Sequence, residues 1–147
     1  MANTTGLKNP VEQYVRDWCS RSFGVAVEDS EKEIRLVTGG VHRFDVVAKD
    51  RSLVAGIKTS SLRDNGRVGT GTIKSTYTEI YFLSIVKADK KLMILTDKRY
   101  CDYFQGKSKG KIVQDVEIIY CPLPKRLAEE VAAVHKECRK EIGKRNR

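Results

Sequence analysis

The chain has 147 residues, of which 40% are hydrophobic and 32% are charged. This length fits a single domain, and the apolar content excludes a disordered or fibrous chain because it is sufficient to form a core. The 28 lysines and arginines exceed the 19 aspartates and glutamates, which gives a net charge of +9. The basic excess favours a polyanionic partner, since lysine and arginine attract phosphate, although solubility alone also accounts for it.

Nothing in the sequence indicates a membrane or a secreted protein. The longest apolar stretch, residues 80–86, is too short to cross a bilayer, so we expect no membrane partner. Residues 1–7 lack the basic start, apolar core and cleavage site of a secretion signal. The four cysteines are too far apart for a zinc knuckle or a redox pair. We therefore expect reduced, mostly buried thiols in a cytoplasmic protein.

The first half of the chain predicts a helix, three strands and a loop. The helix is capped at Asn9 and begins at Pro10. Three consecutive strands joined by tight turns follow, because short runs of β-branched and apolar residues lie at 34–37, 41–48 and 53–57. Glycine, serine and arginine then predict a loop over residues 60–71.

The second half of the chain alternates helices with strands. Helical spacing favours a helix over residues 73–86, although their β-branched content also fits a strand. The remaining predicted elements are a strand at 91–96, a short helix at 98–104, a strand at 116–120 and an amphipathic helix over 127–142. The order α-β-β-β-α-β-α-β-α predicts an α/β fold, a mixed sheet flanked by helices. We expect one domain over 1–147, with a disordered start at 1–8 and a basic tail at 143–147.

Two charged residues stand out in the strand region. Asp45 interrupts an apolar strand, and Lys58 ends the next strand. An ionised side chain inside a strand costs several kcal/mol of desolvation unless it is paired, hydrated or coordinated. A carboxylate beside an ammonium at the end of a sheet could anchor a divalent metal and position a nucleophilic water. A plain cross-strand ion pair between the two residues is the alternative.

These residues, Phe44-Asp45 and Gly56-Ile57-Lys58, resemble the motif of the PD-(D/E)xK nuclease superfamily, the fold of many restriction enzymes. The resemblance implies a restriction-endonuclease-like sheet and magnesium-dependent hydrolysis of DNA phosphodiesters, with Mg²⁺ or Mn²⁺ weakly bound. It assigns metal binding to Asp45 and the backbone carbonyl of Ile57, and orientation of water or stabilisation of charge to Lys58. Glu12 would hold a metal-bound water. By analogy with members that cut both strands, a homodimer is expected.

The departure from this motif is Gly56, which occupies the position of the second acid. Three explanations remain open. The acid has migrated, with Glu79 as the best candidate and Glu33 as a weaker one; or the site is inactive and the fold serves as a nucleic-acid-binding or interaction module; or Gly56 is an introduced substitution that silences a nuclease. Asp45 with a backbone carbonyl and waters could still hold a weak magnesium ion.

The loop after Lys58 carries groups that suit a nucleic-acid contact. These are Thr59, Ser60, Arg63, Arg67 and Lys74. A nucleotide-binding P-loop is rejected because the lysine comes two residues late in the glycine-rich stretch. We therefore expect DNA as the partner, with RNA as an alternative. A solvated connection explains the loop equally well.

Other residues near the motif have simple structural interpretations. Glu12 fits the N3 position of a capping box with Asn9. Glu79 is expected to face solvent more readily than to bind a ligand. His42, three residues before Asp45, is expected to cap its strand, with a position facing the site as the alternative.

Overall fold

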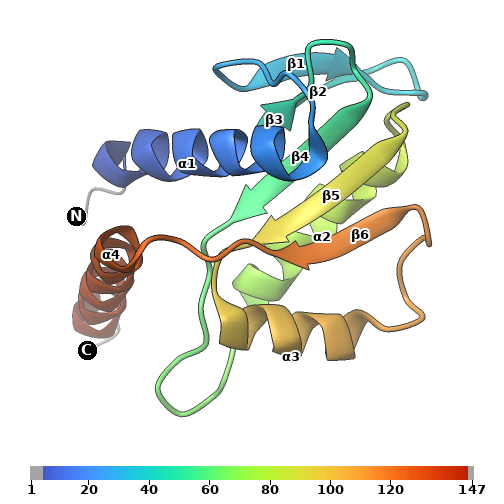
Figure 1. The fold of residues 1–147 in the computed structure, drawn as a ribbon. Helices are drawn as coiled ribbons and strands as arrows, with labels where there is room; N and C mark the ends of the chain where they lie inside the picture. Colours follow the sequence, from blue (N-terminus) through green and yellow to red (C-terminus); the bar gives the residue numbers. More distant parts are fainter. Residues whose placement is uncertain (1–4, 146–147) are drawn as a thin grey trace.

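The computed structural model describes residues 5–145, in which a helix and four successive strands are followed by alternating helices and strands (Figure 1). In chain order the elements are α1 (Thr5–Phe23), β1 (Lys32–Arg35), β2 (Val41–Phe44), β3 (Val46–Val47), β4 (Leu53–Lys58), α2 (Thr70–Ser84), β5 (Lys90–Leu95), α3 (Lys98–Ser108), β6 (Val116–Tyr120) and α4 (Lys125–Arg145). The predicted α/β class, with a mixed sheet flanked by helices, is confirmed.

The central sheet has the strand order β3-β4-β5-β6. β3 pairs antiparallel with β4, whereas β4, β5 and β6 are mutually parallel. Each parallel pair is joined through a helix, α2 between β4 and β5 and α3 between β5 and β6, as a parallel connection requires. The carboxyl ends of β4, β5 and β6 therefore lie at one edge of the sheet.

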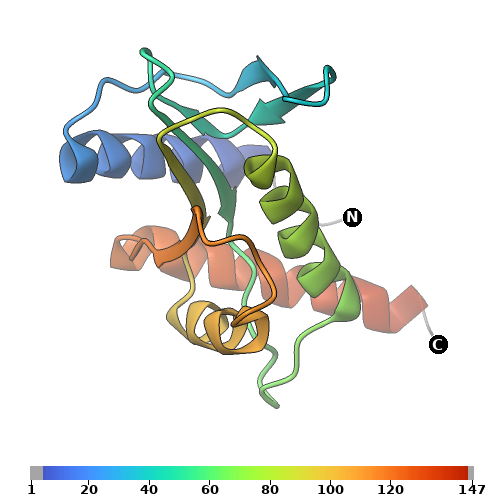
Figure 2. The same ribbon diagram turned by 90° about the vertical axis from the view of Figure 1, so that its right-hand side faces the viewer.

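Helices cover both faces of this sheet. Successive buried residues of β5 alternate between two cores: Met93 and Leu95 pack with α2 and α3, whereas Leu92 and Ile94 pack with α1 and α4. This alternation follows from the two-residue period of a strand. In Figure 2, α2 and α3 lie nearer the viewer, and α1 and α4 lie farther away. A strand buried on both faces explains why this segment is apolar without interruption.

The predicted strand 41–48 is wrong as a single element, because the chain changes sheets at Asp45. β2 pairs with β1 in a separate two-stranded sheet, whereas β3 belongs to the central sheet. The Asp45 carbonyl accepts a hydrogen bond from Arg16 Nε at 3.0 Å, and its carboxylate accepts one from the Ile57 N–H at 2.8 Å. The carbonyl and the carboxylate of Asp45 therefore form hydrogen bonds outside a regular strand ladder, and β2 ends before this residue. The Asp45 side chain lies at the junction of the two sheets.

The predicted start of the first helix is also wrong. α1 begins at Thr5, so Asn9 and Pro10 lie inside it rather than at its start, and Glu12 is not the N3 residue of a capping box. Residues 5–8 are helical rather than disordered, and 143–145 belong to α4; residues 1–4 and 146–147 lie outside the described part. The predicted helix after the loop is confirmed as α2, and α3 extends four residues beyond its predicted end at 104.

Two simpler expectations concern the helices and the cysteines. Of the helices described between residues 5 and 145, none is long and apolar enough to cross a membrane. All four cysteines are free; three are buried and Cys138 is partly exposed. The expectation of reduced, mostly buried thiols agrees with this arrangement.

Candidate functional site

A cleft of about 460 Å³ lies at the carboxyl end of β4. Its walls come from α1, β2, β4, the loop that follows β4, α2 and α4. The cleft brings together the predicted residues Glu12, Asp45, Ile57, Lys58 and Glu79. Residues that are 67 positions apart in the chain (12 to 79) therefore line one cleft.

The register between β4 and α2 explains where two of these residues lie. Positions 56 and 58 on β4 point to the same side of the strand, toward α2, because side chains alternate along a strand. Positions 75 and 79 share one face of α2, because they are one helical turn apart. Lys58 Nζ donates a hydrogen bond to Ser75 Oγ at 2.8 Å. One turn along, Gly56 faces Glu79.

Gly56 leaves room for the Glu79 side chain. A Cβ atom at position 56 would lie 2.5 Å from Glu79 Cγ and 2.9 Å from Glu79 Oε1. The carboxyl group of Glu79 therefore occupies the space that a side chain at position 56 would enter. The expectation that Glu79 faces solvent is wrong, because only 14% of its side chain is exposed.

Asp45 and Lys58 do not form the cross-strand ion pair that the sequence allowed. In the part of the chain that the structure describes, Asp45 is held by Ile57 and Lys58 by Ser75, with no ion pair between them. Both side chains line the cleft. The ammonium and the carboxylate therefore remain directed at a shared space rather than at each other.

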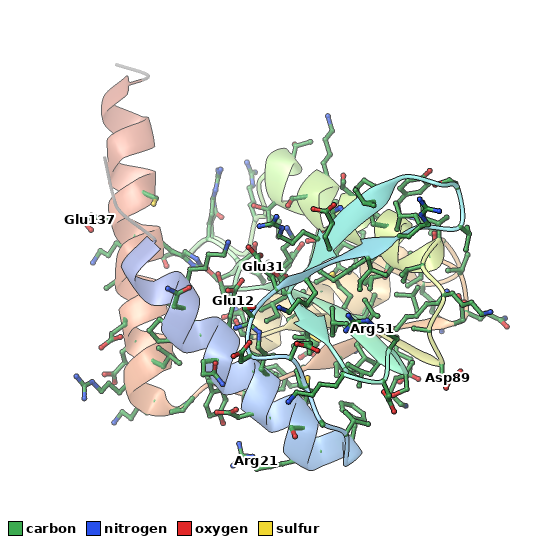
Figure 3. The ribbon with its side chains drawn as sticks, turned by 90° about the horizontal axis from the view of Figure 1, so that it is seen from above. Glu12, Arg21, Glu31, Arg51, Asp89 and Glu137 are labelled. Carbon is green, nitrogen blue, oxygen red and sulfur yellow. The ribbon has the colours of Figure 1, made fainter. Side chains whose placement is uncertain are left out.

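A group of acidic side chains lies on the α1 side of Asp45. One carboxylate oxygen each from Glu12, Glu31 and Asp45 lies within 4.8 Å of the others. Figure 3 shows Glu12 on α1 and Glu31 close together. Glu12 is 8% exposed, and Arg16 Nη2 lies 3.5 Å from its Oε2 atom. Burial and the nearby Asp45 carboxylate raise the pKa of Glu12 to about 7.

Glu79 forms a second acidic wall of the cleft on the α2 side. Burial and, to a smaller extent, the Asp45 carboxylate raise its pKa, whereas His42 and Lys58 act in the opposite direction. His42 Nε2 lies 3.2 and 3.3 Å from the two Glu79 oxygens. Asp45 therefore has carboxylates on both sides, Glu12 and Glu31 on one and Glu79 on the other.

The donor set of the cleft suits a hard divalent cation. Asp45, Glu79 and Glu12 line the cleft, and Glu31 lies beside Glu12 and Asp45 outside its walls; all four offer carboxylate oxygens, which Mg²⁺ and Mn²⁺ prefer over nitrogen or sulfur. Burial is the largest cause of the raised pKa of Glu12, and the negative charge of Asp45, which a cation would offset, is the second. Ile57, whose backbone carbonyl is the other predicted ligand, also lines the cleft.

The predicted phosphate-contacting residues divide into two sets. Thr59 and Ser60 line the cleft beside Lys58. Arg63, Arg67 and Lys74 are exposed and lie outside its walls. The loop that carries the two arginines turns back on itself, since the Arg63 N–H donates to the Arg67 carbonyl at 2.9 Å. Cleft contacts and outer contacts are therefore spatially separate.

Glu33, the weaker candidate for a migrated acid, is not part of the site. It is exposed on β1, where its carboxylate lies 3.7 Å from Arg43 Nη2. It is absent from the described residues that line the cleft. The choice between the two candidate acids therefore favours Glu79.

Several residues in or beside the cleft were not predicted from the sequence or were given the other role. His42 faces the site, which was the alternative to the expected strand cap. Its spacing from Phe44 could have shown this, since both residues lie on the side of β2 that faces α2. The spacing of Arg16 four residues after Glu12 predicts their ion pair. For Glu31 and Ser75 the sequence contains no comparable signal, because their positions depend on packing between elements.

Comparisons with protein-family models, with curated proteins and with solved structures found no match for this chain.

Proposed function

We propose that this protein is a metal-dependent nuclease domain of the PD-(D/E)xK type that hydrolyses DNA phosphodiesters. In this proposal Glu79 supplies the acid that Gly56 lacks. The observation that carries the proposal is the overlap between the Glu79 carboxyl group and the space of a side chain at position 56. A migrated acid accounts for this overlap, because the glycine leaves the space that the Glu79 carboxyl group fills.

The fold supports the same proposal in its finer detail. The acid of the proposed motif lies where β2 passes into β3, and the lysine ends the adjacent strand, β4. Both side chains enter the cleft together with Glu12 from the first helix. This is the placement that the resemblance to a restriction-endonuclease-like fold requires of Asp45, Lys58 and Glu12.

Each residue then has a distinct role. Asp45 and Glu79 would hold Mg²⁺ or Mn²⁺, with Glu12 and Glu31 completing the negative surroundings. The metal, when bound, polarises the phosphodiester and lowers the pKa of water. Lys58 has its ammonium fixed by Ser75. It would donate hydrogen bonds to the phosphate oxygens and stabilise the charge that develops on them in the transition state.

The substrate class is inferred from charge. The chain carries a net charge of +9, and Thr59 and Ser60 place hydroxyl groups in the cleft. Arg63 and Arg67 on the adjacent loop would contact backbone phosphates beyond the cleaved bond. Such contacts position a nucleic acid without reading its sequence. Binding should therefore weaken as the salt concentration rises.

The test is to move the acid from the helix back to the strand. Glu79→Ala should abolish cleavage of plasmid DNA with Mg²⁺ or Mn²⁺. Gly56→Glu alone should also impair cleavage, because the new side chain would collide with Glu79. The double variant Gly56→Glu, Glu79→Ala removes that collision and should recover activity. Glu33→Ala, which removes the exposed acid of β1, is the matched control and should cleave like the wild type.

Two outcomes would contradict this function. If Glu79→Ala cleaves as fast as the wild type, Glu79 is not the relocated acid. If no variant cleaves, while the wild type binds DNA at low salt and Asp45→Ala does not alter that affinity, the domain is a binding module. Circular dichroism on each variant separates loss of the site from loss of the fold.

A further inference from the structure

His42 lies beside the relocated acid on a different element of the fold. It is part of β2, three residues before Asp45, and 23% of its side chain is exposed. Its Nε2 atom faces both carboxylate oxygens of Glu79, at 3.2 and 3.3 Å. When Glu79 is ionised its carboxylate only accepts hydrogen bonds, and the tautomer of His42 with hydrogen on Nε2 then donates to it.

Two aromatic rings fix the orientation of the imidazole. Phe82 stacks on it, with ring centroids 3.9 Å apart and an interplanar angle of 8°. Phe44 contacts it edge-on, with centroids 4.8 Å apart and an angle of 77°. Phe82 lies three residues after Glu79 on α2, so one helix face supplies both the stacking ring and the carboxylate. The imidazole is therefore held on two sides with Nε2 directed at Glu79.

A relocated acid needs such a support for a physical reason. A carboxylate at position 56 would start from the backbone of a central strand and reach the site over a short distance. Glu79 starts from a helix and crosses the gap above Gly56 on a long side chain with several rotatable bonds. Glycine contributes no side chain to hold it, and the hydrogen bonds described for the Glu79 carboxylate come from His42. Another group must therefore fix the direction of the Glu79 carboxylate.

We propose that His42 is a positioning residue that holds the Glu79 carboxylate in the space above Gly56 and so prepares it to bind the metal. This inference rests on the proposed function of Glu79. Groups that orient metal ligands typically change metal affinity about 10–100-fold when they are removed. Asp45 and Lys58 also line the cleft, but within the described residues only His42 contacts Glu79 through a side-chain hydrogen bond.

The test is a titration of the full chain with Mn²⁺, followed by electron paramagnetic resonance, which reports metal binding without relying on cleavage. His42→Phe keeps an aromatic ring for stacking and removes the hydrogen-bond donor. We expect it to weaken Mn²⁺ binding about 10-fold or more. His42→Gln keeps a donor and should recover part of the affinity. Arg35→Gln, which alters an exposed residue of β1 that does not line the cleft, should bind Mn²⁺ like the wild type.

A double-mutant cycle separates positioning from a general effect on the fold. In a Glu79→Gln background, His42→Phe should cause little further loss of Mn²⁺ affinity, because the carboxylate that it orients is gone. Full additivity of the two losses would overturn the proposal. Unchanged Mn²⁺ affinity in His42→Phe, with reduced affinity in Glu79→Gln, would refute positioning and leave the proposed function intact. If the wild type binds no Mn²⁺, or Glu79→Gln binds it equally well, both proposals fail.

If His42→Phe does not fold, a measurement on the wild-type protein tests the proposal instead. Nitrogen NMR of the wild-type imidazole should show the tautomer with hydrogen on Nε2, and Glu79→Gln should shift that resonance. The tautomer with hydrogen on Nδ1 would overturn the proposal, because Nε2 could then not donate to Glu79.

Discussion

The carboxylates on the two sides of Asp45 differ in the groups that surround them. On the α2 side, Glu79 has a hydrogen-bond partner in His42, and Lys58 has one in Ser75. On the α1 side, Glu12 and Glu31 crowd against Asp45, and burial beside Asp45 raises the pKa of Glu12 to about 7. Among the described residues, each charged group on the α2 side has a single hydrogen-bonding partner. On the α1 side three carboxylates lie within 4.8 Å of one another, with Glu12 paired to Arg16 and Glu31 paired to Lys8 and Arg43.

The largest effect is expected at Asp45, which the two sides share. Asp45→Asn keeps an oxygen that can accept from the Ile57 N–H, so the fold should persist. It removes the charge that both acidic walls surround. Cleavage should fall to the level seen without metal, and Mn²⁺ binding should be lost in the same titration. Retained cleavage would show that neither side forms a metal site with Asp45.

A large but more selective effect is expected on the α2 side. Lys58→Met should reduce cleavage about 100-fold or more, as loss of a group that stabilises transition-state charge does. Mn²⁺ affinity should change little, because Lys58 is not a ligand. Single-turnover cleavage and metal titration measure the two quantities separately. Lys107→Met, at an exposed position of α3 that does not line the cleft, is the matched control. Equal losses in both variants would point to general electrostatics instead.

The charges on the α1 side should make the stability of the fold depend on pH. The fold favours protonated Glu12, since its pKa rises from 4.5 to about 7. Its stabilising contribution is therefore complete below pH 4.5 and is lost as the pH rises through 7. Glu12→Gln should remove this loss, so the stability of the metal-free variant should change less between pH 5 and pH 8 than that of the wild type. Urea unfolding at pH 5 and pH 8 measures the difference.

The effect of pH on the acidic residues can also be measured in the presence of metal. Mg²⁺ should raise the unfolding temperature of the wild type more at pH 8 than at pH 5, because ionised carboxylates bind it and protonated ones do not. The raised pKa of Glu79 acts in the same direction. A pH-independent stability of the wild type between pH 5 and pH 8 would contradict the crowding of charge at Glu12.

The smallest effect is expected outside both acidic walls. Arg63→Ala and Arg67→Ala each remove one exposed charge from the loop after β4. Each should weaken DNA binding a few-fold and reduce the slope of log affinity against log salt by about 0.9. Fluorescence anisotropy at several salt concentrations provides this slope. An unchanged slope would remove the loop from the proposed DNA contact, leaving Thr59 and Ser60 as the nearby polar groups of the cleft.

Periodicity and local chemistry were sufficient for much of the fold. The apolar run of β5 and the helical spacing of α2 are local patterns, so the sequence could predict both. Asp45 and Lys58 were also identifiable, because a charge within or at the end of an apolar strand requires a reason. The start of α1 was not predictable from Asn9 and Pro10, since proline is tolerated near the start of a helix and does not have to begin it.

The sequence by itself determined the α/β class, the positions of Asp45 and Lys58, and the absence of an acid at position 56. Only the tertiary structure placed Glu79 against Gly56, because that contact depends on how α2 packs on β4. It likewise brought His42 to Glu79 and Glu31 to Glu12. Local patterns follow from the periods of helix and strand, whereas these contacts depend on packing between elements that are distant in the chain.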